Sequence, residues 1–252
     1  MNRKEYELMY RFEEQNWWFV IKRKVLETVL NSFEGPGEGT DRSPRILDVG
    51  CGTGIIPLLL QRYGSVWGLD ISQEALQFCK KRKLTQFVCQ SDGLTIPFQG
   101  NTFDIITAID VIEHVERDEV MLKECYRVLR VGGRLYITTS AYPFLWSEHD
   151  EAVGHKRRYT FQELKNKVQK AGFKVKKLTH YHALIFFPVL VLWGLKKMLG
   201  LQNLFKTTHI EISPFFNKIC TQVLKIEPLV LKNVNIPFGI SLLCVGEKEA
   251  RN

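Results

Sequence analysis

The stretch Ile46-Leu-Asp-Val-Gly-Cys-Gly-Thr-Gly54 decides the fold of this chain. A short apolar run meets three closely spaced glycines, and an apolar helical pattern follows them. Glycine is needed where the backbone turns tightly between a strand and a helix and must approach a ligand closely. The dinucleotide fingerprint G-x-G-x-x-G would place its third glycine one residue after Gly54. Asp48 precedes the turn, and a carboxylate there favours a ligand with an amino group over a pyrophosphate.

Outward from this turn, short apolar runs alternate with helical patterns. Strands are predicted at 45–49, 66–69, 87–90, 104–109, 134–138, 174–181 and 241–246, and helices near 55–63, 73–82, 118–129 and 161–171. Thr160-Phe-Gln-Glu163 has the pattern of a capping box at the start of the last of these helices. Strands that alternate with helices form βαβ units. The predicted fold class is therefore α/β, with a doubly wound, mostly parallel sheet.

Two segments lie outside this alternation. Residues 2–33 have a mostly helical period and lead into a stretch rich in Gly and Pro. This predicts an N-terminal helical cap over 1–40, followed by a main domain over 41–252. Residues 183–240 separate the last two predicted strands and are too many for an ordinary connection. They predict a hydrophobic, helical insertion before the last strand.

Four further motifs follow the glycine turn: Asp70 at the end of the second strand, Ser91-Asp92-Gly93, Asp110-Val-Ile-Glu-His114 after the fourth strand, and Leu129-Arg-Val-Gly-Gly133 before the fifth. In this order the motifs resemble those of class I S-adenosylmethionine-dependent methyltransferases, and the resemblance covers about residues 44–140. Val131 stands where the family usually has Pro. The resemblance implies a Rossmann-like, seven-stranded sheet whose last strand is antiparallel, and S-adenosylmethionine as the cofactor.

The resemblance also implies which residues hold the cofactor. The glycine turn would wrap the methionine end, Asp70 would accept hydrogen bonds from the ribose hydroxyls, and Asp92 would meet the adenine amino group. Taken alone, Asp70 suits a nicotinamide ribose equally well, and Asp92 suits a turn; their joint spacing favours S-adenosylmethionine. The predicted cofactor-binding residues are Asp48, Gly50, Cys51, Gly52, Gly54, Asp70, Ile71, Asp92, Gly93 and Asp110.

The catalytic group is less constrained by the sequence. Methyl transfer from a sulfonium is an in-line displacement, so the protein mainly positions the two partners. A base is needed only where the acceptor atom must lose a proton. The candidates follow strands four and five, at the carboxyl edge where open sheets bind ligands. The predicted catalytic residues are Asp110, His114 and His149, and the first two would share one face if their segment is helical. The alternative for His114 is that it braces its turn through a backbone hydrogen bond.

The segment after strand five combines aromatic, His and Arg residues with turn residues, which is typical of a substrate loop. The predicted substrate-binding residues are Tyr142, Trp146, His155, Arg157, Arg158 and Tyr159. The two Arg residues would grip a phosphate or carboxylate bidentately. The alternative is a structured connection in which Arg157 pairs with an acid. The spacing of His149, Asp150 and His155 matches no standard metal site, so no metal is predicted.

Charge and composition narrow the classes of molecule that this protein is expected to bind. The chain has 252 residues and a net charge of +8, and residues 155–177 hold nine Lys and Arg residues against one acid. Such a patch predicts an anionic partner, namely a phosphate-bearing substrate, a membrane surface or nucleic acid; the alternative is a solvated helix. Nucleic acid is disfavoured because no recognition module is visible. Six Cys residues without a C-x-x-C pair, and no visible secretory signal, predict a cytoplasmic protein.

The insertion opens with Ala183–Leu195, an apolar run of 13 residues followed by Lys196 and Lys197. As a helix it would be about 20 Å long, short of a hydrocarbon core of about 30 Å. It suits peripheral membrane contact through 183–197 at the inner membrane face, or an apolar lid over a lipidic substrate. The alternatives are a buried core helix and a dimer helix.

Together these observations predict a methyltransferase that acts on an amphipathic small-molecule, lipid or lipid-linked acceptor. An anionic group on the acceptor would match the basic stretch. Two alternatives stay open. One is a methyltransferase of a soluble small molecule with the insertion as a dimer interface. The other is a non-catalytic module that binds S-adenosylmethionine.

Overall fold

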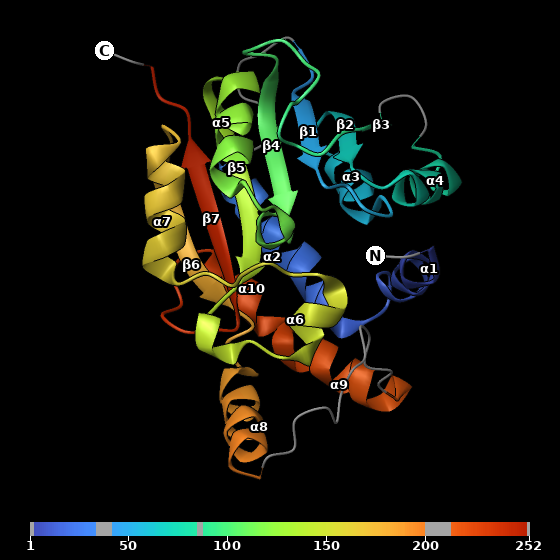
Figure 1. Cartoon of the computed structure of the whole chain (residues 1–252), viewed down its shortest axis with the longest axis vertical. Helices are drawn as coiled ribbons and strands as arrows, with labels where there is room; N and C mark the ends of the chain where they lie inside the picture. Colours follow the sequence, from blue (N-terminus) through green and yellow to red (C-terminus); the bar gives the residue numbers. More distant parts are fainter. Residues whose placement is uncertain (1–2, 34–41, 85–87, 200–212, 251–252) are drawn as a thin grey trace.

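A seven-stranded sheet forms the centre of the molecule in the computed structural model, which describes residues 3–33, 42–84, 88–199 and 213–250 (Figure 1). The strands are β1 Arg45–Val49, β2 Ser65–Asp70, β3 Val88–Gln90, β4 Phe103–Ile109, β5 Leu129–Ser140, β6 Lys174–Tyr181 and β7 Ser241–Glu247. Their order is β3-β2-β1-β4-β5-β7-β6, and β7 runs antiparallel to both β5 and β6. The predicted sheet, with its antiparallel last strand, is confirmed.

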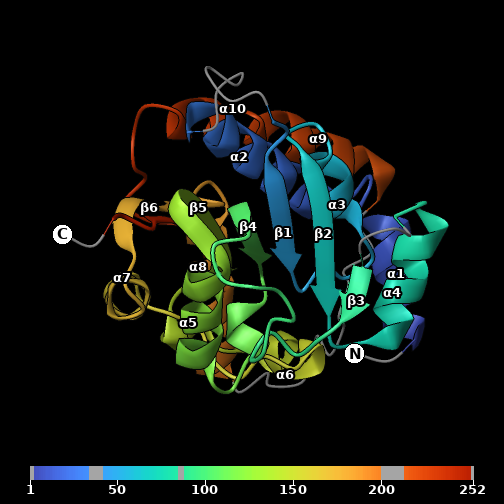
Figure 2. The same ribbon diagram turned by 90° about the horizontal axis from the view of Figure 1, so that it is seen from above.

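Helices cover both faces of the sheet (Figure 2). They are α1 Arg3–Phe12, α2 Trp17–Phe33, α3 Ile55–Leu60, α4 Gln73–Lys81, α5 Asp118–Val128, α6 Glu148–Val153, α7 Phe161–Lys170, α8 Phe186–Leu199, α9 Pro214–Leu224 and α10 Ile226–Leu231, with 3-10 turns η1 Ile112–His114 and η2 Pro143–Leu145. One core cluster joins α5 and α7 to the sheet, and a second joins α2, α3, α9 and α10 to its other face. The carboxyl ends of the parallel strands therefore open onto one edge between these layers.

Three elements differ from the sequence-based expectation. The single helix expected over 2–33 is two helices, α1 and α2, and the Asn16 side chain between them accepts a hydrogen bond from the Trp18 N–H at 3.0 Å. Asn competes for the backbone in this way and favours helix ends. Strand β5 is longer than expected at both ends. Helix α6 was not expected, although Ser147 and Asp150 form the capping box that begins it. The capping box at Thr160 and Glu163 is confirmed.

The insertion divides into two parts. Helices α9 and α10 pack beside α2, where Leu224 and Leu231 join the same buried cluster as Ile21 and Val25. Helix α8 projects from the end of the molecule and has no buried residue (Figure 1). The alternative of a buried core helix at 183–195 is therefore wrong. The domain boundary near residue 40 stays a prediction, and the loop after α2 lies largely outside the described residues.

None of the helices in the described ranges is both long enough and apolar enough to cross a bilayer.

Candidate active site

The glycine turn follows β1 at the carboxyl edge of the sheet. Gly50, Gly52 and Gly54 have φ values of 72°, 52° and 93°, a region that side chains with a Cβ rarely enter. A Cβ on Gly50 would also stand 2.3 Å from a methyl group of Val111, on the segment after β4. The turn is therefore closely packed against the segment that follows β4, and a larger residue at position 50 would not fit.

Asp70 lies at the end of the neighbouring strand, β2, and is tied to this turn. Its carboxylate accepts hydrogen bonds from the Gly52 and Ser72 N–H groups, each at 2.8 Å. Burial raises the pKa of Asp70. The next residue, Ile71, is 67% exposed, so an apolar surface lies beside the carboxylate. The structure thus brings two predicted cofactor motifs into direct contact.

Four further predicted cofactor residues lie at the same edge. Asp48 is buried and accepts a hydrogen bond from the Thr107 hydroxyl, and burial raises its pKa to about 7. Asp92 is exposed, accepts a hydrogen bond from the Leu94 N–H at 2.9 Å, and is followed by Gly93 with a φ of 73°. The Cys51 thiol is buried beneath the turn, 3.9 Å from that of Cys79. A cationic ligand would stabilise the charged form of such a buried acid, which fits the ammonium and sulfonium of S-adenosylmethionine.

The N-terminal cap contacts the glycine turn, which the sequence did not reveal. Glu13, between α1 and α2, accepts hydrogen bonds from the Thr53 hydroxyl and from Arg82 Nη2, the latter at 2.8 Å. Arg82 also donates through Nε to the Thr53 carbonyl at 3.1 Å. Both charged side chains are almost fully buried. These residues are far apart in the chain and carry no local motif, so no sequence signal pointed to them.

Asp110 follows β4 in a left-handed conformation with a φ of 54°. It accepts hydrogen bonds from the Thr138 hydroxyl at 2.6 Å and from the Lys22 ammonium of α2. Burial would raise the pKa of Asp110, but Lys22, the Thr138 hydroxyl and His155 together hold that pKa below its usual range. Lys22 was not predicted as a site residue, because it stands in an apolar helical pattern. Only Ile112–His114 is helical here, so the shared helix face expected for Asp110 and His114 is wrong.

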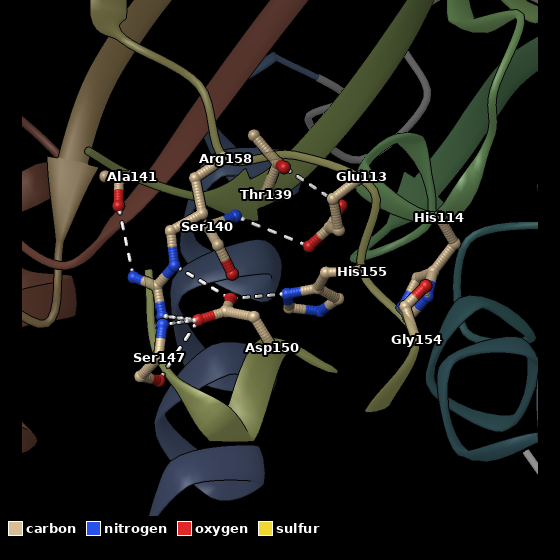
Figure 3. Close-up of polar contacts among 10 residues, drawn as sticks. All are labelled: Glu113, His114, Thr139, Ser140, Ala141, Ser147, Asp150, Gly154, His155 and Arg158. Atoms are coloured by element: carbon tan, nitrogen blue, oxygen red, sulfur yellow. Dashed lines mark hydrogen bonds and ion pairs between the residues drawn. The ribbon is translucent and has the colours of Figure 1, made fainter. Parts of the chain in front are cut away.

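Asp150, His155 and Arg158 form a polar cluster beside this edge, with Asp150 fully buried at its centre (Figure 3). His155 Nδ1 lies 2.7 Å from Asp150 Oδ1, and Arg158 donates two hydrogen bonds to the same carboxylate at 2.8 and 2.9 Å. Burial would raise the pKa of Asp150, but the hydrogen bonds from His155 and Arg158 hold it well below its usual range. An ionised carboxylate thus fixes the orientation of the His155 ring.

Two further ionisable groups surround His155 (Figure 3). The His114 ring stands 4.7 Å from the His155 ring, and its Nδ1 faces the Gly154 carbonyl at 3.3 Å. Burial, and then the neighbouring His155, lower the pKa of His114 to about 4. Glu113 is buried and accepts a hydrogen bond from the Thr139 hydroxyl at 2.9 Å; burial and then Asp110 raise its pKa to about 7. The third histidine, His149, is exposed, with its ring 6.5 Å from that of His155.

The predicted substrate-binding residues fall into two groups. Tyr142 is half-buried just past β5, and its ring stacks on His180 at 5.3 Å; Trp146 is half-buried on the same segment. Arg157 and Tyr159 instead meet Asp118 of α5, at 3.4 and 2.7 Å. Arg157 has the acidic partner that the structural alternative expected. Tyr159 is buried in the core, and the structure does not bring it to the edge with the others. Their substrate roles stay predictions.

The basic stretch 155–177 is partly neutralised by acids from elsewhere in the fold. Besides the two Arg residues, Lys167 pairs with Asp118, and Lys176 with Glu247, both at 2.9 Å. Across the described residues, no group of three or more His, Cys, Asp and Glu side chains is arranged to hold a metal ion.

The segment that contains the glycine turn is similar in sequence to known proteins. Residues 47–137 match the family described as methyltransferase domain, a segment that contains the glycine turn, Asp70 and Asp110. Over these residues the chain carries a methyltransferase domain. Its relatives include the ubiquinone biosynthesis O-methyltransferases of Coxiella burnetii, 31% identical over 136 residues, and of Rattus norvegicus mitochondria, 35% identical over 130 residues. These matches cover 50% and 47% of this chain, and 57% and 36% of those proteins.

Solved structures of methyltransferases share the fold over nearly the whole chain. An S-adenosylmethionine-dependent methyltransferase from Thermotoga maritima superimposes with a TM-score of 0.62, at 20% identity, over 98% of this chain and 96% of that one. A phosphoethanolamine N-methyltransferase from Haemonchus contortus, solved with S-adenosylhomocysteine, gives a TM-score of 0.57 at 18% identity. This match covers 90% of this chain and 52% of that one. At these identities the likeness concerns the fold.

Proposed function

We propose that this protein transfers the methyl group of S-adenosylmethionine to a hydroxyl group of an amphipathic acceptor. The observation that carries the proposal is the Asp150–His155 pair beside the cofactor residues at the carboxyl edge. His155 is near enough to Asp110 to help lower the pKa of Asp110. A proton acceptor and the cofactor motifs therefore meet where parallel α/β sheets bind their ligands.

The proposed mechanism assigns each residue a task. S-adenosylmethionine, when bound, supplies a methyl group on a leaving group that needs no further activation. The glycine turn and Asp70 hold and orient it. His155 Nδ1 donates to Asp150, which leaves Nε2 as the atom that accepts the proton of the acceptor hydroxyl. Asp150 is a positioning residue, since it acts through His155.

The other two histidines suit this task less well. The lowered pKa of His114, about 4, makes its ring a weak base near neutral pH. His149 is exposed, and its ring approaches His155 rather than the buried Asp150. The His155 ring is held by the buried carboxylate of Asp150.

Support for an amphipathic acceptor comes from two sides. The relatives named above act, by their names, in the biosynthesis of ubiquinone. In this chain the acceptor edge is bordered by aromatic rings: Tyr142 lies 5.3 Å from both Phe144 and Phe186. Phe186 begins the projecting helix α8. An acceptor with a polar reactive end and an apolar body fits such a border.

A transfer assay with the methyl-labelled cofactor tests the proposal. Purified protein is incubated with lipid and aqueous fractions of a cell extract, and label is expected in a lipid-extractable, base-stable ether. His155→Gln should lower the rate about 10²- to 10⁴-fold, while leaving the cofactor Kd within about twofold. His149→Gln, the matched control, should change the rate only a few-fold.

Three results would contradict the proposal. Label confined to the aqueous fraction would indicate a soluble acceptor. Equal losses in the two histidine variants would remove the special role of His155. Tight cofactor binding with no labelled product in either fraction would favour the non-catalytic module.

A further inference from the structure

Helix α8 has an outward face as apolar as its inward face. The inward side holds the half-buried residues Phe186, Val189, Leu190 and Trp193, which follow helical spacing. The outward side holds Phe187, Val191, Leu192, Leu195 and Met198, which are between 47% and 83% exposed. A surface helix normally places polar residues on its solvent face. A continuous apolar face of this kind marks a site of interaction.

The described part of the insertion carries mostly positive charge, although Glu148 of α6 pairs with Lys196 of α8 at 3.8 Å. In the described part of the insertion, residues 183–199 and 213–240, Glu227 is the only acid, and it is buried. The same ranges contain five lysines, Lys196, Lys197, Lys218, Lys225 and Lys232. Lys197 lies at the end of α8, with its ammonium 5.2 Å from the centre of the Trp193 ring. Apolar side chains bordered by cations match the interface of an anionic bilayer.

The position of α8 connects this face with the acceptor edge. An aromatic row runs from Trp193 to Phe144 at 5.6 Å, and from Phe144 to Tyr142 at 5.3 Å. Tyr142 lies two residues past the end of β5. Figure 1 shows α8 projecting beyond the carboxyl ends of β1 and β4, on the side that carries η1, α6 and the start of α2. A surface that receives α8 would therefore also face the acceptor edge.

We propose that the outward face of α8 docks the protein onto the surface of an anionic lipid bilayer. The helix has 14 residues, about 21 Å, so it lies in the interface and does not span the bilayer. Its apolar face enters the boundary between headgroups and acyl chains, and the lysines meet anionic headgroups. Trp193, with one side on apolar rings and the other toward Lys197, suits that boundary. This inference concerns where the protein acts, and its tests do not depend on methyl transfer.

Sedimentation with vesicles tests the proposal on the full chain. Vesicles of phosphatidylglycerol and phosphatidylcholine in equal parts should bind the protein at about 0.1 M salt, and less tightly at about 1 M, where screening shortens the Debye length to about 3 Å. Vesicles of phosphatidylcholine alone should bind it more weakly. Leu192→Asp should weaken binding about ten- to hundredfold, because it removes one inserted apolar side chain and adds an anion.

Val131→Asp is the matched control. Val131 is 58% exposed, close to the 61% of Leu192, but lies in the turn of β5 at the opposite edge of the sheet. Its substitution should leave vesicle binding within about twofold. Both variants should bind S-adenosylmethionine as the wild type does, which shows that they are folded.

Fluorescence quenching locates the contact. Phosphatidylglycerol with brominated acyl chains should quench the emission of Trp193, and Trp193→Phe should lose most of that quenching while still sedimenting with vesicles. Absence of wild-type binding at low salt would overturn the proposal, as would equal binding by Leu192→Asp and the wild type. A dimer that Leu192→Asp dissociates, without vesicle binding, would instead make α8 an interface between two copies.

Discussion

At the scale of single residues, the cofactor edge is unusual for its buried acids. Asp48 and Asp70 both have a raised pKa, chiefly because burial disfavours their charged forms. Each is held by a small number of hydrogen bonds, from Thr107 in one case and from backbone N–H groups in the other. A cation that enters the site would favour the charged forms of these carboxyl groups, and their negative charge would in turn stabilise the bound cation. The edge is therefore prepared for a positively charged ligand.

Asp48 makes cofactor affinity depend on pH. With a pKa of about 7, Asp48 is partly protonated in the ligand-free protein near neutral pH, and a bound cation should favour its carboxylate. The complex then holds fewer protons than the free protein, so affinity should rise with pH. We expect S-adenosylmethionine to bind about fivefold more tightly at about pH 7 than at about pH 6, with proton release in calorimetry. Asp48→Asn should abolish this dependence; a dependence that survives in Asp48→Asn would assign it to another group.

At the scale of elements, α1 is fastened to the glycine turn by charges. Tyr6 of α1 packs in a small cluster with Ala75 and Phe78 of α4, and Met9 joins its edge. The buried pair between Glu13 and Arg82 adds the polar link to this contact. Because the cofactor turn lies beneath it, the position of α1 governs how closely that turn is covered. The N-terminal helices thus contact the turn that is predicted to hold the cofactor.

Two neighbouring glutamates allow a matched test of this link. Glu13→Ala leaves the buried Arg82 without its buried partner and should lower the free energy of unfolding by about 3 kcal/mol. Glu14→Ala removes the exposed partner of the same Arg82, 2.6 Å away, and should cost less than about 1 kcal/mol. Urea denaturation measures both changes. Glu13→Ala should also weaken S-adenosylmethionine binding, and equal effects of the two substitutions would show that burial of the pair is unimportant.

At the scale of the whole molecule, a buried acid, Glu227, links the end of the insertion to its start at the end of β6. Glu227 of α10 accepts hydrogen bonds from the backbone N–H groups of His182, at 3.0 Å, and Ala183, where the chain leaves β6. His182 has a φ of 57°, so these bonds support a strained turn. The same turn directs the chain into α8. The insertion is therefore integrated into the fold at its start, while α8 projects from it.

Glu227→Ala should destabilise the whole molecule. It leaves two buried backbone N–H groups without an acceptor, at a cost of about 1–3 kcal/mol each. We expect a loss of about 2–4 kcal/mol in urea denaturation, and weaker vesicle binding because α8 loses its orientation. Glu249→Ala is the control: its ion pairs with Lys174 and Lys176 are exposed and should contribute less than about 1 kcal/mol. A loss in Glu227→Ala no larger than in this control would contradict the structural role of Glu227.

The seven strands, the helices that alternate with them and the order of the cofactor motifs could all be predicted from the sequence. These features have local causes: the glycines set the turn conformation, alternating apolar runs set the strands, and Asp70 stands at a fixed place after a strand. Even the unexpected α6 had a local signal in Ser147 and Asp150. By contrast, the break between α1 and α2 at Asn16 was not predicted, because the helical spacing of apolar residues continues past that position.

The contacts between polar side chains became visible only in the folded molecule. Lys22 reaches Asp110, and Glu13 reaches Arg82, across long stretches of chain. The role proposed for His155 rests on the same kind of contact, because its distance from Asp150 and its approach to His114 depend on how the loop after β5 folds back. The exposure of α8 was also undetermined by its sequence, since an apolar helix can be buried or exposed and only packing distinguishes the two. Local pattern fixes backbone conformation, whereas burial and pairing of charges depend on contacts between distant segments.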